Sequence, residues 1–489
     1  MDWFVFPCSK QELALFLRMA CLELNQPIFN IVGEEADALG LDCYVVGGYV
    51  RDLLLGRPCK DIDFMCVGDG LELAHRVALR LGKTDSLSVF KNFGTAHFNW
   101  EDLDIEFVGA RKESYTRNSR NPQVSQGTLD DDLNRRDFTI NALAVCVNTQ
   151  RFGELVDAFD GISDLNSGLI RTPLEAEKTF DDDPLRMLRA LRFSMQLDFE
   201  IQDDLWLAMP LLAPRMDILA KERIADELNK MMACKEPGRM FLMLDKAGLL
   251  ETIFPEFSLL KGVEKVNGLS HKDNFYHTIE VLNNLAQLTD NIWLRWAAVL
   301  HDIAKPQTKR FEPGHGWTFH GHEDLGARMV PKIFKKLGLP GNEKMKFVQK
   351  MVRLHLRPIV LAKHEITDSA LRRLLMDAGE DLESLLLLCQ ADITSKNPNR
   401  VARYLRNYEI VKQKLQEVEE KDQIRNFQPP VSGEEIIQHF NIAPGPVVGQ
   451  IKSSIKESIL DGHIPNEREA AWNLMIELGI KFGLTEPQK

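Results

Sequence analysis

The 489-residue sequence predicts an α/β head followed by an all-α remainder, in a chain of several domains. Short β-rich runs alternate with helical runs only in the first 165 residues, whereas helical periods dominate from about residue 175 to the end. Strands mixed with helices are typical of an α/β domain, and helical periods without strands are typical of an all-α one. At roughly 100–200 residues per domain, the length suggests three or four domains.

Three strands are expected in the head. Residues 43–47 and 62–67 are apolar runs of the kind found in buried strands, and residues 103–108 alternate as in a half-buried strand. The polar stretch 112–127 contains Asn, Ser, Arg and one Pro but no apolar period. We therefore predict a surface loop there.

The first strand runs directly into a predicted helix through Gly47 and Gly48. The helix is expected over residues 49–55 and ends at Gly56. Glycines at such a junction let backbone N–H groups approach an anion at the helix N-terminus, and Arg51 can add a charged contact to a phosphate. A glycine pair before a helix is by itself a weak signal, because most such pairs are only turns.

The second strand carries two carboxylates. Alternate residues of a strand point the same way, so Asp61 and Asp63 share one face while Ile62 faces the core. Two such oxygen ligands suit Mg²⁺, which prefers carboxylates together with substrate phosphates. Glu106, on the neighbouring predicted strand, is a candidate third catalytic carboxylate or only an outward-facing residue. An isolated D-x-D on an exposed strand would more often be structural.

Five segments in order give a specific resemblance. The glycine turn with the D-x-D strand resembles the first motif of class II tRNA nucleotidyltransferases, which are the CCA-adding enzymes and bacterial poly(A) polymerases, with a head like that of DNA polymerase β. Four later segments resemble the family's other motifs: residues 135–142, 157–161, 182–193 and 221–228. One departure is Asp182, where the family usually has Glu. The resemblance covers roughly residues 40–260.

The fourth motif has residues suited to choosing a base. Asp183, Arg186 and Arg189 are three apart and form a row on a helix that starts near Pro184. Arg only donates hydrogen bonds and ionised Asp only accepts them, so the first two can pair with the amino group and ring nitrogen of cytosine or adenine. The same segment would otherwise be an amphipathic helix with a solvated basic face. The resemblance places three arginines near the incoming triphosphate: Arg136, Arg189 and Arg192.

A second constellation lies in residues 265–400, which contain eight of the twelve histidines. Four residues in order resemble the H…HD…D pattern of HD-type phosphohydrolases: His277, His301, Asp302 and Asp392. Some HD domains recruit further ligands at the positions of His322 and His355. Imidazole and carboxylate together suit a divalent transition metal. The resemblance implies a phosphatase or cyclic phosphodiesterase acting on RNA ends, and a single histidine here would more simply be structural.

Four domains are therefore expected: a catalytic head (1–165), a helical neck with the nucleotide-selecting and RNA-binding motifs (166–262), an HD domain (263–400) and a helical tail without a recognised motif (401–489). Residues 328–357 contain nine basic side chains against one acidic one. That excess could follow an RNA backbone or form a solvated helix face.

Composition sets outer limits on the function. Hydrophobic residues are 44% and charged residues 27% of the chain, as in ordinary globular proteins, which argues against disorder or fibrous repeats. The formal net charge of −12 argues against a uniformly basic nucleic-acid binder. The eight cysteines form no C-x-x-C pair, and we see no signal peptide or long apolar run. We expect a cytoplasmic protein with no membrane span.

The resemblance implies a template-independent enzyme that adds CCA to tRNA 3′ ends from CTP and ATP, with Mg²⁺ at Asp61 and Asp63. An A-adding enzyme or poly(A) polymerase is the alternative, because these enzymes share every motif quoted. A further alternative is an HD phosphohydrolase whose N-terminal half only binds RNA. The sequence leaves the oligomeric state open.

Overall fold

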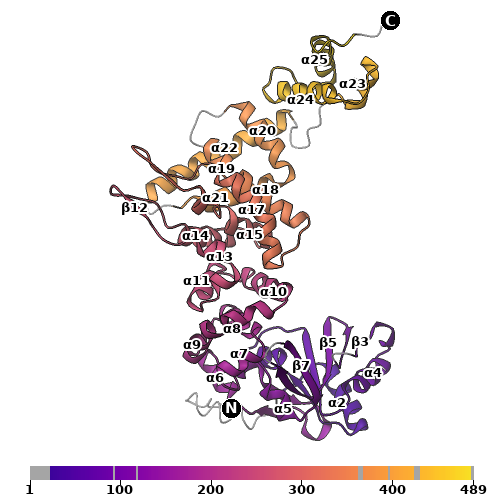
Figure 1. Ribbon diagram of the computed structural model, residues 1–489. Coiled ribbons are helices and arrows are strands. Elements are labelled where there is room, and N and C mark those ends of the chain that lie inside the picture. The colour runs from indigo at the N-terminus through magenta and orange to yellow at the C-terminus, as the bar shows by residue number, and fades with distance from the viewer. Residues whose placement is uncertain are drawn as a thin grey trace, which may run out of the picture. The chain divides into compact units, whose positions relative to one another are not determined.

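The computed structural model describes residues 22–91, 94–116, 119–361, 367–394, 397–422 and 430–485. Figure 1 labels its elements. The chain divides into two compact units, Met1–Cys234 with Arg239–Pro255, and Lys235–Gly238 with Glu256–Lys489. The first unit contains a mixed sheet with helices and the second is mostly helical, which confirms the predicted fold class.

One seven-stranded sheet forms the core of the head. Its strand order is β3-β4-β5-β2-β1-β8-β9, and all neighbours are antiparallel except β2 and β5. The three predicted strands correspond to β1, β2 and β5, with bounds within about one residue of those expected. The strands are β1 (Cys43–Val46), β2 (Asp61–Cys66), β3 (Ser88–Phe90), β4 (Thr95–Trp100), β5 (Leu103–Gly109), β8 (Leu143–Cys146) and β9 (Leu155–Asp157).

The two faces of the central strands differ in polarity. Phe64 on β2 pairs in register with Phe107 on β5, and the two rings stack at 5.3 Å between centroids. Phe29 of α2 (Pro27–Leu39) contacts Phe64, and α4 (Gly70–Arg80) packs against β4 and β5. This apolar face is the core, so the alternate residues of the same strands point away from it.

The predicted loop at 112–127 is wrong. Residues there form a separate antiparallel pair, β6 (Arg111–Thr116) and β7 (Ser119–Gln126). Backbone hydrogen bonds between these two strands require no buried apolar face, so a strand pair of this kind leaves no apolar period in the sequence. Directly after β7, the backbone of Gly127 passes close to that of Arg111. A Cβ on Gly127 would lie only 2.6 Å from the Arg111 carbonyl carbon, so a larger residue would not fit there.

The helices of the neck follow the head within the first unit. The predicted helix after Pro184 is α8, which begins at Leu185. A short parallel strand pair, β10 (Leu169–Ile170) and β11 (Glu200–Ile201), brackets it. The head also contains α3 (Gly48–Leu54) and α5 (Leu129–Asn134). The helices from the end of the head through the neck are α6 (Gly161–Ser167), α7 (Ala176–Asp182), α8 (Leu185–Leu197), α9 (Asp203–Leu212), α10 (Lys221–Met232), α11 (Gly238–Lys246) and α12 (Leu250–Ile253).

Where the structure describes it, the second unit is helical apart from two small hairpins, β12 (Lys265–Val266) with β13 (Leu269–Ser270), and β14 (Arg310–Glu312) with β15 (Gly316–Thr318). These hairpins and the β10–β11 pair are the departures from an all-α remainder. Among the described residues, none of the helices has the length and apolar character needed to cross a bilayer. The helices are α13 (Pro255–Ser258), α14 (Asn274–Ala286), α15 (Ile292–Leu300), α16 (Lys305–Thr308), α17 (His322–Leu337), α18 (Glu343–Leu354), α19 (Leu356–Leu361), α20 (Asp368–Ala378), α21 (Leu382–Asp392), α22 (Pro398–Asp422), α23 (Gly433–Phe440), α24 (Pro446–Leu460) and α25 (Arg468–Lys481).

Candidate active site and metal centre

The predicted catalytic carboxylates lie on the polar face of the sheet. Asp63 on β2 is directly opposite Glu106 on β5, and Asp61 is opposite Asp104. Ile62, between the two aspartates, is buried, whereas Asp61 and Glu106 are exposed. Because paired residues of neighbouring strands share a face, the three predicted catalytic residues come together.

The surroundings of Asp63 disfavour the ionised form of its carboxyl group. Its burial and the negative charge of Glu106 raise its pKa from 3.8 to about 6, although the Arg136 guanidinium opposes that shift. A bound cation would relieve this repulsion, as expected where two or three carboxylates meet.

His97 also belongs to this face, and the sequence analysis missed it. On β4 it is in register with Glu106, and its side chain forms an ion pair with Asp104. The alternation of residues 95–100 could have placed His97 on a polar strand face, but nothing in that short run identifies its partner.

The glycine junction lies beside the same site. Gly47 has a φ of 75°, a conformation that side chains with a Cβ rarely adopt. A Cβ at Gly47 would lie 3.0 Å from Nη1 of Arg136 and 3.5 Å from Oδ2 of Asp63, and one at Gly48 would lie 3.6 Å from Nη2 of Arg51. The turn therefore brings backbone close to both an arginine and a candidate metal ligand.

Three of the predicted nucleotide-binding arginines surround one ring. The guanidinium carbons of Arg51, Arg189 and Arg192 lie 5.0, 5.4 and 4.0 Å from the centroid of Phe193, within the range of cation–π contacts. Phe193 is itself buried and meets Phe138 edge to face. The sequence analysis did not single out Phe193.

Carboxylates hold these arginines in place. Arg51 is paired with Asp52 at 2.7 Å, Arg136 with Asp132 at 2.9 Å, Arg189 with Asp137 at 2.6 Å and Arg192 with Glu227 at 2.5 Å. Burial opposes ionisation of Asp137, but Arg189 and Asn141 outweigh it and lower its pKa to about 2. The cluster is therefore a network of ionised pairs whose arginine positions are fixed before any ligand binds.

The two proposed base-selecting residues lie at the start of α8. Oδ1 of Asp183 accepts a hydrogen bond from the Leu185 amide at 3.1 Å, and its Oδ2 accepts one from Arg223 at 3.2 Å. Arg186 is buried and donates to the carbonyls of Thr179 and Arg135. These contacts orient both side chains and leave Arg186 with a structural role as well.

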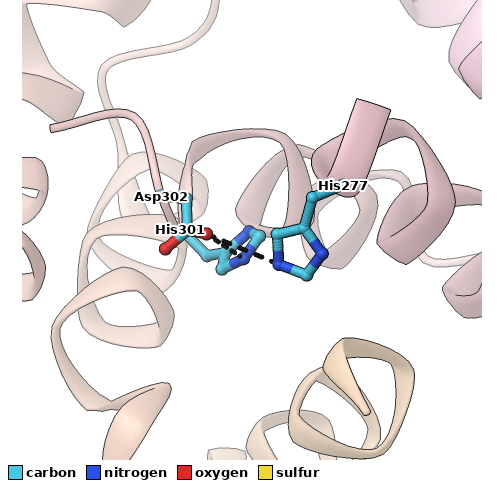
Figure 2. A group of neighbouring side chains, drawn as sticks. All are labelled: His277, His301 and Asp302. Carbon is cyan, nitrogen blue, oxygen red and sulfur yellow. Dashed lines mark ion pairs between the residues drawn. The ribbon is translucent and has the colours of Figure 1, made fainter. Parts of the chain in front are cut away.

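In the second unit, the HD residues converge on Asp302, as Figure 2 shows for His277 and His301. Oδ2 of Asp302 lies 3.5 Å from Nε2 of His277 and 3.2 Å from Nε2 of His301, while Asp392 Oδ1 lies 3.0 Å from Nε2 of His277. The other oxygen, Oδ1, lies 3.2 Å from Nε2 of His322 and 3.9 Å from Nε2 of His355. All six predicted residues therefore lie together. His277, His301 and Asp302 form one group of potential ligands, with Asp392 next to His277. Asp302 also forms a second group with His322 and His355.

The histidine tautomers fit a metal. The Nδ1 atoms of His301, His322 and His355 each donate to a backbone carbonyl at 2.7 Å, so the proton is on Nδ1. Their Nε2 atoms are buried without a hydrogen-bond partner and face carboxylate oxygens. Burial lowers the pKa of His355 to about 3, which keeps it in the neutral form that binds metals.

Two lysines adjoin this centre and were missed in the sequence analysis. Nζ of Lys305 donates to Oδ2 of Asp302 at 2.6 Å, and Nζ of Lys272 lies 2.9 Å from Nδ1 of His277. Lys305 follows the HD pair by three residues, a spacing that puts it one helical turn away. Lys272 precedes α14 and could not be placed without the fold.

The basic stretch 328–357 is largely neutralised by its neighbours. Five of its nine basic side chains form ion pairs, mostly with acids outside the stretch. The pairs are Lys336–Glu256, Lys346–Glu343, Lys350–Asp381, Arg353–Asp324 and Arg357–Asp377. This pairing favours the solvated-face interpretation over a continuous RNA track.

Family models match successive parts of the chain. The Poly A polymerase head domain matches residues 43–171, and the probable RNA and SrmB-binding site of polymerase A matches residues 198–260. The HD domain matches residues 274–397, and a putative tRNA nucleotidyltransferase domain 2 matches residues 346–474. The last match covers much of the predicted tail, in which the sequence analysis recognised no motif.

Whole-chain similarity decides the family. A protein of Nitrosococcus oceani named multifunctional CCA protein is 32% identical over 73% of this chain and 86% of its own length. The chain belongs to the tRNA nucleotidyltransferase family. Another similar tRNA nucleotidyltransferase is the A-adding one of Deinococcus radiodurans, 32% identical over 70% of this chain and 78% of its own length.

The fold of tRNA nucleotidyltransferases agrees with this assignment. The CCA-adding enzyme of Thermotoga maritima, solved in complex with tRNA, matches with a TM-score of 0.58 at 22% identity, over 95% of this chain and 98% of that one. The predicted family, enzyme class and HD domain are thereby confirmed. Both domain types depend on metal ions.

Proposed function

We propose that this protein is a template-independent nucleotidyltransferase that adds CCA to tRNA 3′ ends from CTP and ATP in the cytoplasm. The observation that carries the proposal is the shared polar face of Asp61, Asp63 and Glu106 beside the arginine network. Mg²⁺ held by Asp61 and Asp63 would help to activate the tRNA 3′-hydroxyl and stabilise the departing pyrophosphate. Gly47 and Gly48 lie close enough for backbone contact with phosphates.

The protein's own residues position the reactants. Arg136 lies next to the Asp63 carboxylate, where it can contact the triphosphate, and Arg51, Arg189 and Arg192 extend the positive charge around Phe193. Asp183 and Arg186 would pair with the amino group and ring nitrogen of cytosine or adenine. Catalysis is then mainly orientation and electrostatic stabilisation.

Replacing the metal ligands tests this proposal. We expect Asp61→Ala and Asp63→Ala to reduce incorporation of labelled CTP and ATP into tRNA by at least about a thousandfold, because two ligands anchor the metal. Both variants should keep the wild-type circular dichroism spectrum. Asp102→Ala is the matched control, since Asp102 precedes β5 and is highly exposed. Normal incorporation by either ligand variant would contradict the assignment.

A-adding activity is the second candidate, because the Deinococcus radiodurans relative is named for it. Asp183 and Arg186 present acceptor and donor groups that suit cytosine and adenine equally. The two activities therefore differ in which tRNA end the enzyme accepts, and that difference is measurable.

For the second unit we propose a metal-dependent phosphohydrolase acting on RNA ends. Three buried Nε2 atoms that face one carboxylate support a divalent transition metal held by His277, His301, Asp302 and Asp392. His322 and His355 lie at the other oxygen of Asp302. Lys272 and Lys305 add positive charge for a phosphate.

Metal retention tests that centre. The purified protein should contain a transition metal, and Asp302→Ala should lose it, because Asp302 contacts all four histidines. His315→Ala, at an exposed histidine outside the cluster, should retain it. Metal analysis by mass spectrometry distinguishes these cases, and a wild-type protein without bound metal after purification and reconstitution would refute the centre.

A further inference from the structure

A cavity of about 170 Å³ adjoins the metal centre of the second unit. It is bounded by α19, by the end of α21 with the residues that follow, and by α22. The lining residues are Pro358, Ile359, Cys389, Asp392, Ile393, Thr394, Tyr404 and Tyr408. Asp392 is therefore both a candidate metal ligand and part of the cavity wall.

The end of the cavity next to the centre is polar. Thr394 accepts a hydrogen bond from Nζ of Lys272 at 2.7 Å, and its hydroxyl lies 3.1 Å from Nδ1 of His277. Lys272 also contacts that histidine directly. A ligand entering here would meet a cation and the metal ligands, an environment suited to a phosphate.

The rest of the cavity is apolar and aromatic. Tyr404 and Tyr408 are one helical turn apart on α22, so they face the same side. The Tyr408 hydroxyl is fixed on the Leu386 carbonyl at 3.1 Å and its ring is buried, whereas the Tyr404 ring is partly exposed. Pro358 and Ile359 add an apolar wall from α19.

We propose that this cavity binds the base of a nucleotide whose phosphate lies at the histidine–aspartate centre, with the base stacked on Tyr404. The proposal rests on the phosphohydrolase function proposed above and names its substrate class. A nucleotide combines the two chemistries that the cavity offers, a flat apolar ring and an anion. Aromatic side chains bind bases of any sequence by stacking, which suits an enzyme acting on varied RNA ends.

Binding, measured apart from hydrolysis, tests the proposal. The probes are adenosine 3′-phosphorothioate and glycerol 2-phosphorothioate, which share a secondary thiophosphate ester, whereas the glycerol compound lacks the base and the ribose ring. Calorimetry on the full-length, metal-loaded protein gives both dissociation constants. Tyr404→Ala should weaken adenosine 3′-phosphorothioate binding about tenfold and leave the glycerol compound unchanged.

Two further variants distinguish stacking from disruption of the fold. Tyr404→Trp keeps an aromatic surface and should preserve adenosine 3′-phosphorothioate binding. Leu405→Ala removes an exposed neighbour on the same helix that does not line the cavity and should also preserve it. Equal affinity of the wild type and Tyr404→Ala for this probe, or an equal loss for both probes, would overturn the proposal.

Hydrolysis of adenosine 3′-monophosphate by the same preparations tests the underlying function separately. Tyr404-dependent binding without hydrolysis would refute the phosphohydrolase and keep the base site. Hydrolysis that is unaffected by Tyr404→Ala, with unchanged binding, would keep the phosphohydrolase and overturn the base site.

Discussion

Asp63 shows how the active site costs stability. Its pKa of about 6, against 3.8 as the ordinary value, means that burial and Glu106 disfavour its charge in the folded protein. Below about pH 3 the carboxyl is protonated in both the folded and the unfolded protein, so the penalty is absent. As the pH rises through 4 to 6 the unfolded chain ionises more readily, and the folded state loses stability that it does not regain at higher pH.

Asp63→Asn should therefore stabilise the metal-free protein at pH 7.5 by about 1–3 kcal/mol and have little effect at pH 3. Urea unfolding in EDTA, followed at both pH values, measures this difference. Adding Mg²⁺ should stabilise the wild type more than the variant, because the variant lacks a ligand. Equal stability of the two proteins at pH 7.5 in EDTA would contradict the electrostatic account.

Among individual residues, the sequence identifies site residues that belong to a recognisable motif. The D-x-D pair and the H…HD…D set were predicted because their spacing and residue types are restrictive, and the structure brings each set together. His97 and Lys272 escaped prediction because their importance comes from strand register and from packing, which place them beside residues distant in sequence.

At the scale of elements, α8 combines core packing with arginines that we propose bind the nucleotide. One of its faces is buried through residues such as Leu188 and Leu191, while its arginines join the network around Phe193. The sequence predicted this helix and its start because two signals are local: Pro184, and the spacing of three residues between Asp183, Arg186 and Arg189. It failed at the β6–β7 pair because backbone pairing between polar strands leaves no such signal.

Arg186→Ala should reduce the preference for CTP and ATP over UTP and GTP by about tenfold, because it removes one of the two groups that we propose pair with the base. Single-nucleotide incorporation rates with each triphosphate measure the preference. Arg186 also holds two backbone carbonyls, so its loss will destabilise the helix start. Leu191→Ala controls for that effect, since it should destabilise α8 without changing nucleotide preference. Unchanged preference in Arg186→Ala would exclude the assigned role.

For the whole molecule, two compact units carry one candidate centre each. The boundaries predicted at residues 165, 262 and 400 stay predictions, whereas the order of head, RNA-binding segment and HD domain agrees with the family models. The net charge of −12 was a poor guide to RNA binding, because the carboxylates clustered at the two candidate metal centres add to the number of acidic residues. The distribution of arginines around Phe193 is the informative quantity.

The most direct test of the central claim uses tRNA transcripts that end before CCA, before the final A, and after the complete CCA. Each is incubated with CTP, ATP or both, and the products are resolved at single-nucleotide length. We predict that the first transcript gains three nucleotides when both triphosphates are present, that the second gains one A, and that the third gains none. Addition of A alone to the second transcript, with none to the first, would contradict CCA addition and favour the A-adding alternative.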